Sequence, residues 1–186
     1  MAQQPLAERL RPQSLDDYIG QKHLVGENGV FRKFIATGSV PSFILWGPPG
    51  VGKTTLAKIV ANALDRPFYT LSAVTSGVKD VREVIEKAKN QHLFSARPAF
   101  LFIDEIHRFN KSQQDSLLGA VEQGIVTLIG ATTENPSFEV ISPLLSRCQV
   151  YVLKPMDDSE LQTLLDRALT TDSELQRRHI EVVETE

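Results

Sequence analysis

The chain has 186 residues with 20 basic and 23 acidic side chains, so its formal net charge of −3 argues against bulk electrostatic binding to nucleic acid. A hydrophobic fraction of 41% is typical of a globular domain and excludes a disordered chain. No apolar run is long enough for a transmembrane helix, and the polar N-terminus is unlike a signal peptide. The single cysteine, Cys148, excludes an internal disulfide framework and a cysteine-based zinc site and indicates the cytoplasm.

Short apolar segments alternate with helical patterns along the chain. We expect strands at 42–46, 68–71, 99–103, 125–130 and 150–153. Because these segments lack clean alternation, they are expected to be buried on both faces. The last helical stripe begins with Asp157 and Glu160, which resemble a capping box, and continues through Leu161, Leu164, Leu165, Ala168 and Leu169. The order predicts an α/β fold with a parallel five-stranded sheet in an α/β/α sandwich.

A phosphate-binding loop follows the first expected strand. Its eight residues match the pattern G-x-x-x-x-G-K-[ST]: Gly47, Pro48, Pro49, Gly50, Val51, Gly52, Lys53 and Thr54. Backbone N–H groups of such a loop, with the N-terminus of the next helix, form an anion site. We expect Lys53 to reach the β- and γ-phosphates, Thr54 to supply a hydroxyl to Mg²⁺, and Thr55 to complete the nucleotide site. A Gly/Pro turn with a chance lysine is the alternative.

Two carboxylates, Asp104 and Glu105, end the third expected strand. The carboxyl edge of a parallel sheet is where α/β proteins bind ligands. We expect Asp104 to hold Mg²⁺ through its water shell and Glu105 to polarise the attacking water. The alternative is an acidic turn that caps the next helix.

With both motifs in place, the chain resembles an AAA+ P-loop ATPase, and more narrowly the replication-associated recombination protein A family, which is related to clamp loaders. The resemblance extends from Leu6 to about Leu169, and its specific parts are the segments HRFNK at 107–111 and GATTENPSF at 130–138. It implies an AAA+ core at 1–154 with an adenine-pocket segment at 6–21. The start of a truncated helical lid would follow at 155–186, after Pro155.

The resemblance also implies roles for single residues. In the N-terminal segment, Arg11, Tyr18, Ile19 and Gly20 would hold the adenine, although Tyr18 would otherwise pack in an ordinary core. One of Thr132 and Thr133 would be the polar sensor, with Thr133 favoured, unless both are ordinary strand-end threonines. In the triplet Ser146-Arg147-Cys148, Arg147 would be an arginine finger in the neighbouring subunit's site rather than a surface ion pair, and Cys148 a buried hydrophobe.

The implied function is that of a DNA-dependent ATPase that hydrolyses ATP with Mg²⁺ in replication-fork maintenance, recombination and repair. It would be cytoplasmic and nucleoid-associated, and it would form a homo-oligomer through a C-terminal region missing from this chain. Implied partners are single-stranded, gapped or forked DNA, single-strand-binding protein and replisome components. His107, Arg108 and Lys111 would contact DNA unless they form a solvated turn. The alternatives are a clamp-loader subunit, a Holliday-junction branch-migration motor, or a nucleotide-switched scaffold with little hydrolysis.

Overall fold

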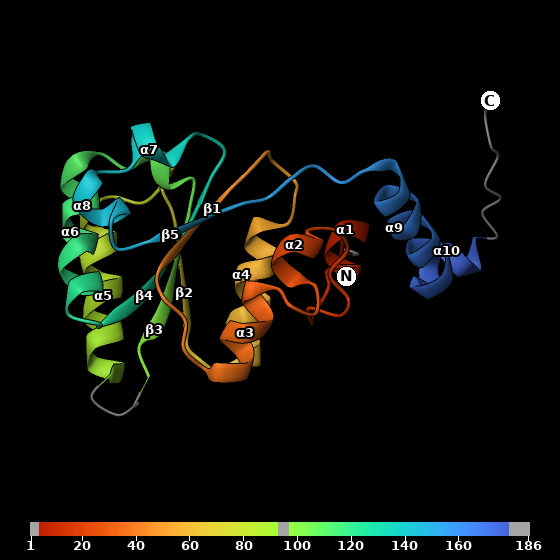
Figure 1. The fold of residues 1–186 in the computed structure, drawn as a ribbon, viewed down its shortest axis with the longest axis horizontal. Coiled ribbons are helices and arrows are strands. Elements are labelled where there is room, and N and C mark those ends of the chain that lie inside the picture. The colour runs from red at the N-terminus through yellow and green to blue at the C-terminus, as the bar shows by residue number, and fades with distance from the viewer. Residues whose placement is uncertain (1–3, 93–96, 179–186) are drawn as a thin grey trace.

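The computed structural model describes residues 4–92 and 97–178. Its sheet has five strands, all parallel, in the order β2-β3-β4-β1-β5 (Figure 1). Their bounds are Phe43–Trp46 for β1, Phe68–Ser72 for β2, Ala99–Asp104 for β3, Val126–Thr132 for β4 and Gln149–Val152 for β5. The five-stranded parallel sheet predicted from the sequence is confirmed, with each strand within two residues of its expected bounds.

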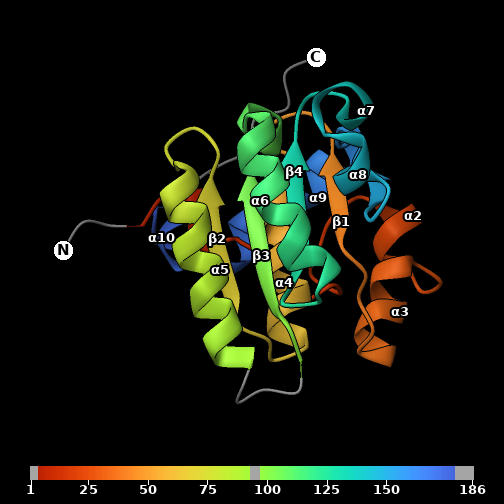
Figure 2. The same cartoon turned by 90° about the vertical axis from the view of Figure 1, so that its left-hand side faces the viewer.

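Helices lie on both faces of this sheet, as the alternating pattern predicts. The α-helices are α1 Leu6–Arg9, α2 Lys22–Val25, α3 Val30–Thr37, α4 Lys53–Ala63, α5 Val78–His92, α6 Lys111–Glu122, α7 Pro136–Glu139, α8 Ser142–Leu145, α9 Asp158–Thr171 and α10 Ser173–Arg177; a 3-10 turn, η1, spans Ile106–Arg108. Helices α5 and α6 cover one face, and α3 and α4 cover the other (Figure 2). None of the helices in the described part of the chain is long and apolar enough to cross a membrane.

Alternate residues of the central strands supply the two halves of the core. Phe100 and Phe102 of β3 pack with α4, whereas Leu101 and Ile103 pack with α5 and α6. All four side chains are at most 1% exposed. A central parallel strand is apolar at every position because helices cover both of its faces. Burial of apolar surface contributes about 25 cal/mol per Å² to the free energy of unfolding. Strand β3 therefore stabilises the fold through these four buried apolar side chains.

The expectation that every strand is buried on both faces is wrong at the two edge strands, β2 and β5. In β2, Thr70 is exposed and Leu71 is the one buried residue. Strand β5 is likewise only partly covered. Tyr151 packs into an aromatic cluster with Phe31, Phe34 and Phe43, but Val150 and Val152 are 40% and 45% exposed. The physical reason is that β5 has a single neighbouring strand, β1, and side chains alternate between its two faces. One face meets α3, and the other is left partly uncovered.

The helical pair α9–α10 lies beyond the sheet, beside the N-terminal segment (Figure 1). Its start has the predicted capping box, in which Asp157 accepts from the Glu160 N–H and Glu160 accepts from the Asp157 N–H. The N-terminal segment is tied to this pair by Arg9, whose Nε lies 2.7 Å from Asp172 Oδ2 and whose Nη2 lies 2.9 Å from Oδ1. The two-point bond to Arg9 lowers the pKa of Asp172 to about 2.

Candidate functional site

A cleft of about 660 Å³ opens between the phosphate loop, the N-terminal segment and α9. It lies at the carboxyl ends of β1 and β3, where parallel sheets bind ligands. The sequence-predicted residues that line it are Arg11, Tyr18, Ile19, Pro49, Gly50, Val51, Gly52, Lys53, Thr54, Thr55, Asp104 and Glu105. Two motifs that are 50 residues apart in the sequence therefore face one space.

The phosphate loop has the backbone that its glycines permit. Gly50 has φ +80° and Gly52 has φ +95°, a region that favours glycine. At Gly52 a Cβ would lie 2.3 Å from the Tyr18 hydroxyl oxygen, so the N-terminal segment approaches the loop too closely for a side chain. Gly47 and Pro48 lie at the base of the loop, outside the cleft lining, where a Cβ on Gly47 would lie 2.4 Å from the Leu153 carbonyl oxygen.

Lys53 begins α4 with its ammonium group turned back into the loop. Nζ donates to the carbonyl oxygens of Gly47 at 2.7 Å and of Pro48 at 2.8 Å. The residue is 8% exposed. Burial lowers the pKa of the ammonium group, while Glu105 and Asp104 act in the opposite direction and favour its charged form. A cation is thus held at the floor of the cleft, close to two carboxylates.

The acidic pair occupies the end of β3 and the turn that follows it. Asp104 is in register with Ser72 of β2, and its carbonyl accepts from the Ala73 N–H at 3.0 Å. Glu105 has φ +54°, a left-handed conformation that costs a non-glycine residue about 1–2 kcal/mol. Such strain is typical of functional positions. The turn sends the next residues, which form η1, back toward β4.

The two candidate sensor threonines have different surroundings. Thr132 is fully buried, and its hydroxyl accepts from the Glu134 N–H at 3.0 Å and donates to the Glu134 carbonyl at 3.1 Å. Thr133 is partly exposed, and its Oγ1 lies 3.4 Å from Glu105 Oε2. Neither threonine lines the cleft, but Glu105, which the Thr133 hydroxyl contacts, does line it.

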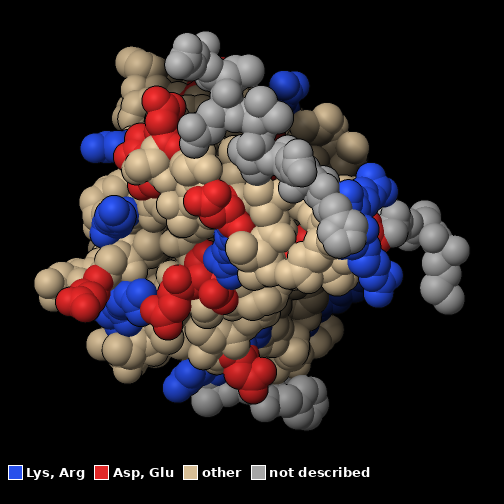
Figure 3. Space-filling model, turned by 90° about the vertical axis from the view of Figure 1, so that its right-hand side faces the viewer, with Lys and Arg blue, Asp and Glu red and all other residues tan. Residues whose placement is uncertain are grey.

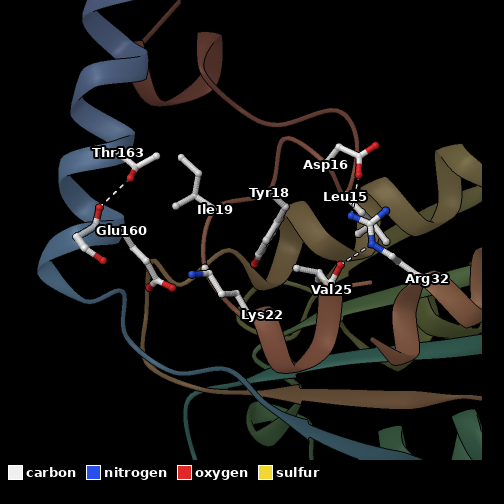
Figure 4. Close-up of a pocket in the computed structure, with 12 residues that line it drawn as sticks. Leu15, Asp16, Tyr18, Ile19, Lys22, Val25, Arg32, Glu160 and Thr163 are labelled. Carbon is white, nitrogen blue, oxygen red and sulfur yellow. Dashed lines mark hydrogen bonds and ion pairs between the residues drawn. The ribbon is translucent and has the colours of Figure 1, made fainter. Parts of the chain in front are cut away.

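Tyr18 and Ile19 form the N-terminal wall of the cleft. Tyr18 packs in the core and donates its hydroxyl to the Val51 carbonyl at 3.1 Å. Burial raises the pKa of this hydroxyl, so it stays protonated and remains a donor. Ile19 projects toward α9 between the cleft and a second cavity of about 360 Å³ (Figure 4). Gly20 lines only this second cavity, together with Glu160.

Helix α9 and Met156 before it supply cleft residues that sequence reasoning missed. Met156, Leu164, Leu165 and Ala168 line the cleft opposite the phosphate loop. Leu165 is 59% exposed, and its position on the wall of an open cleft explains this exposure of an apolar side chain. The sequence does contain an apolar stripe on this helix, which includes Leu164, Leu165 and Ala168. From the sequence alone, that stripe indicates ordinary helix packing. Arg167 joins this wall to the N-terminal segment through the Asp17 carboxylate, 3.0 Å away.

Arg147 lies outside its own cleft. It follows α8, where its guanidinium donates to the Pro143 carbonyl at 2.6 Å and pairs with Glu122. Its side chain is 40% exposed, and it is not among the residues that line the cleft. Helix α8 is on the opposite side of the sheet from α9 and α10 (Figure 1). Cys148 is half-buried, and burial raises the pKa of its thiol to about 12, so it remains protonated.

The three residues expected to contact DNA, His107, Arg108 and Lys111, differ in their exposure. Arg108 and Lys111 are exposed. His107 is not, because η1 turns its side chain inward, where it is 13% exposed and contacts Glu105 and Thr132. Its assignment to a DNA-facing surface was therefore wrong. On the side that carries α9 and α10, acidic and basic side chains are interspersed (Figure 3).

The chain is similar to several known proteins. Replication-associated recombination protein A of Haemophilus influenzae is 53% identical over 165 residues, which cover 89% of this chain and 37% of that protein. The ATPase WRNIP1 of Dictyostelium discoideum is also 53% identical, over 89% of this chain and 19% of its own length. The chain thus spans 37% or less of these two relatives.

The solved structures with a similar fold include the RuvB Holliday junction branch migration motor of Thermotoga maritima. It superposes with a TM-score of 0.71 and 34% identity, over 87% of this chain and 54% of that chain. Residues 43–156, from β1 to just before α9, match the ATPase family associated with various cellular activities (AAA). The phosphate loop and the acidic pair both fall inside that match, and the chain belongs to the AAA family of ATPases.

Proposed function

We propose that this chain is the catalytic domain of a DNA-dependent ATPase that acts in replication-fork maintenance, recombination and DNA repair. One observation supports the catalytic part most strongly: the phosphate loop and the acidic pair line a single cleft. The relatives named for replication-associated recombination support the biological setting. We also propose a core at 1–154 and a lid that begins at 155.

The residues of the cleft fit ATP and Mg²⁺. Thr54 and Asp104 offer a hydroxyl and a carboxylate, the hard oxygen donors that Mg²⁺ accepts, often through water. Arg11 lines the cleft, and its Nε is buried with no hydrogen-bond partner within the described residues. A buried donor without a partner costs about 1–3 kcal/mol, which a bound nucleotide could offset.

In the proposed reaction, Lys53 holds the β- and γ-phosphates and the loop N–H groups bind their oxygens. Thr54 and Asp104 would hold Mg²⁺, which when bound would neutralise charge on the phosphates. Glu105 orients and polarises the attacking water. Thr133, in contact with Glu105, acts as the sensor, and Tyr18 and Ile19 face the adenine. Arg147 acts in the site of a neighbouring subunit, which its distance from its own cleft supports.

The proposed partners are DNA and further copies of the same protein. Single-stranded, gapped and forked DNA are the proposed substrates, with single-strand-binding protein and replisome components as protein partners. We place the protein in the cytoplasm, associated with the nucleoid. Oligomerisation is proposed because Arg147 does not line the cleft of its own chain, so as a finger it would act in the cleft of a second subunit.

The setting is tested by measuring ATP turnover of the full-length protein with single-stranded, duplex, gapped and forked DNA. Stimulation by gapped or forked DNA is expected, and equal turnover with and without every DNA would contradict the proposal. A branch-migration motor is the second candidate, supported by the RuvB superposition. It would respond most to four-way junctions and would move them.

We predict that Lys53→Ala removes most of the affinity for ATP. The substitution deletes the buried cation of the cleft, which is the mobile positive charge for the phosphates. Titration with a fluorescent ATP analogue measures the effect. Lys58→Ala is the matched control, because Lys58 lies on the same helix and does not line the cleft. Equal affinity of Lys53→Ala and the control would refute the nucleotide assignment.

We predict that Arg108→Ala combined with Lys111→Ala reduces the salt dependence of DNA binding. Each lost phosphate contact lowers the slope of log K against log salt by about 1. Arg82→Ala with Lys89→Ala removes the same charge from exposed positions of α5 and should leave the slope unchanged. A wild-type slope in the first double variant would place the DNA surface elsewhere.

A further inference from the structure

The turn after Glu105 is held against β4 by tight packing. Ile106 is fully buried, and a Cβ on Gly130 would lie only 3.2 Å from its Cδ1. This close approach brings η1 onto the end of β4. The left-handed backbone at Glu105 reverses the chain so that the next polar side chain, His107, points back into the site.

His107 lies between the proposed catalytic base and the strand that carries the sensor. Its Nδ1 is 3.2 Å from Glu105 Oε2 and 3.0 Å from Thr132 Oγ1. The imidazole is 13% exposed and Glu105 is 28% exposed, so bulk water screens their contact only partly. Nothing in the reaction described above uses this side chain.

The hydrogen-bond pattern identifies the protonated ring nitrogen. Thr132 has a single hydroxyl proton, which it donates to the Glu134 carbonyl. A carboxylate can only accept. Nδ1 is hydrogen-bonded to Thr132 and lies 3.2 Å from the Glu105 carboxylate, so a proton on Nδ1 is the arrangement that suits both neighbours. Through this N–H the ring faces the Glu105 carboxylate and the Thr132 hydroxyl together.

We propose that His107 is a positioning residue, which fixes the carboxylate of Glu105 relative to the end of β4. This inference rests on the proposed role of Glu105 as the base. Glu105 sits on a strained turn, and among the described residues the hydrogen bond that its carboxylate accepts from the Thr133 hydroxyl is long, at 3.4 Å. The His107 ring supplies a second contact with the same oxygen, Oε2. Thr132 in turn anchors His107 through its own bonds to Glu134.

The test is steady-state ATP hydrolysis by the full-length protein with His107→Ala and His107→Asn. Displacement of a catalytic group by about 1 Å can cost about 100-fold. We expect His107→Ala to lower kcat about 10- to 100-fold with little change in the KM for ATP. His107→Asn should restore much of kcat, since its amide N–H branches from Cγ as Nδ1–H does. His92→Ala, at an exposed histidine of α5, is the control.

The outcomes separate this inference from the proposed function. If Glu105→Gln keeps wild-type turnover, the base assignment itself is wrong. If Glu105→Gln stops turnover but His107→Ala keeps wild-type kcat, only the positioning role is refuted. It is also refuted if His107→Asn, with a wild-type melting temperature, is as slow as His107→Ala. If the alanine variant does not fold, His107→Asn and His107→Gln are compared, and the role requires kcat to follow the reach of the side-chain N–H.

A double substitution adds a further test. In the Glu105→Gln background the carboxylate that His107 positions is gone. His107→Ala should therefore add no further loss to the residual turnover. An additional independent loss of tenfold or so would mean that His107 acts on another group, and would overturn the proposal.

Discussion

Glu105→Gln in the full-length protein is expected to leave ATP bound and unhydrolysed. The amide keeps the size of the side chain but cannot take a proton from water, and Asp104 and Lys53 remain in the cleft. General bases contribute about 10²–10⁴-fold to a rate, and a loss of that size is expected in kcat. ATP affinity should stay near the wild-type value because the phosphate loop is unchanged.

Single-turnover hydrolysis and nucleotide retention measure the two parts of this expectation. Asp115→Asn is a suitable control, since Asp115 is an exposed acid of α6 that does not line the cleft. Wild-type turnover of Glu105→Gln would show that another group positions the water. Loss of ATP binding instead of hydrolysis would show that the carboxylate holds the nucleotide.

Arg147→Ala is expected to bind ATP normally and to lose most hydrolysis. A finger stabilises charge that develops in the transition state, so its loss lowers kcat more than binding. In small GTPases such a finger contributes about 10³–10⁵ to the rate, and a smaller factor is expected in a ring of subunits. Glu122→Gln is the informative comparison, because it removes the ion-pair partner of Arg147 but keeps the guanidinium.

Mixed oligomers test whether the finger acts between subunits. When Arg147→Ala and Glu105→Gln subunits are combined, some interfaces contain both an intact finger and an intact base. Such mixtures should recover part of the activity that neither variant shows alone. If mixed oligomers form and no ratio restores turnover, the action of Arg147 in a neighbouring site is wrong.

The sequence by itself determined the sheet, the phosphate loop and the acidic pair. Each of these features follows from a short contiguous pattern. In the phosphate loop, the glycine spacing permits a φ of +80° at Gly50 and +95° at Gly52. In β3, an apolar run ends in two carboxylates. The capping box at Asp157 and Glu160 is equally local. Such features depend on neighbours within a few residues, so no long-range contact was needed to recognise them.

Only the tertiary structure decided which side chains complete the site. His107 faces Thr132 across 25 residues of sequence, and Arg167 reaches Asp17 across 150. The resemblance to clamp loaders placed His107 on a DNA-facing surface, and the alternative of a solvated turn also placed it on the surface. The packing of Ile106 on Gly130 instead turns the His107 side chain toward Glu105 and Thr132. In the same way, the exposure of Val152 and the cleft position of Leu165 depend on which elements cover them, which periodicity alone does not specify.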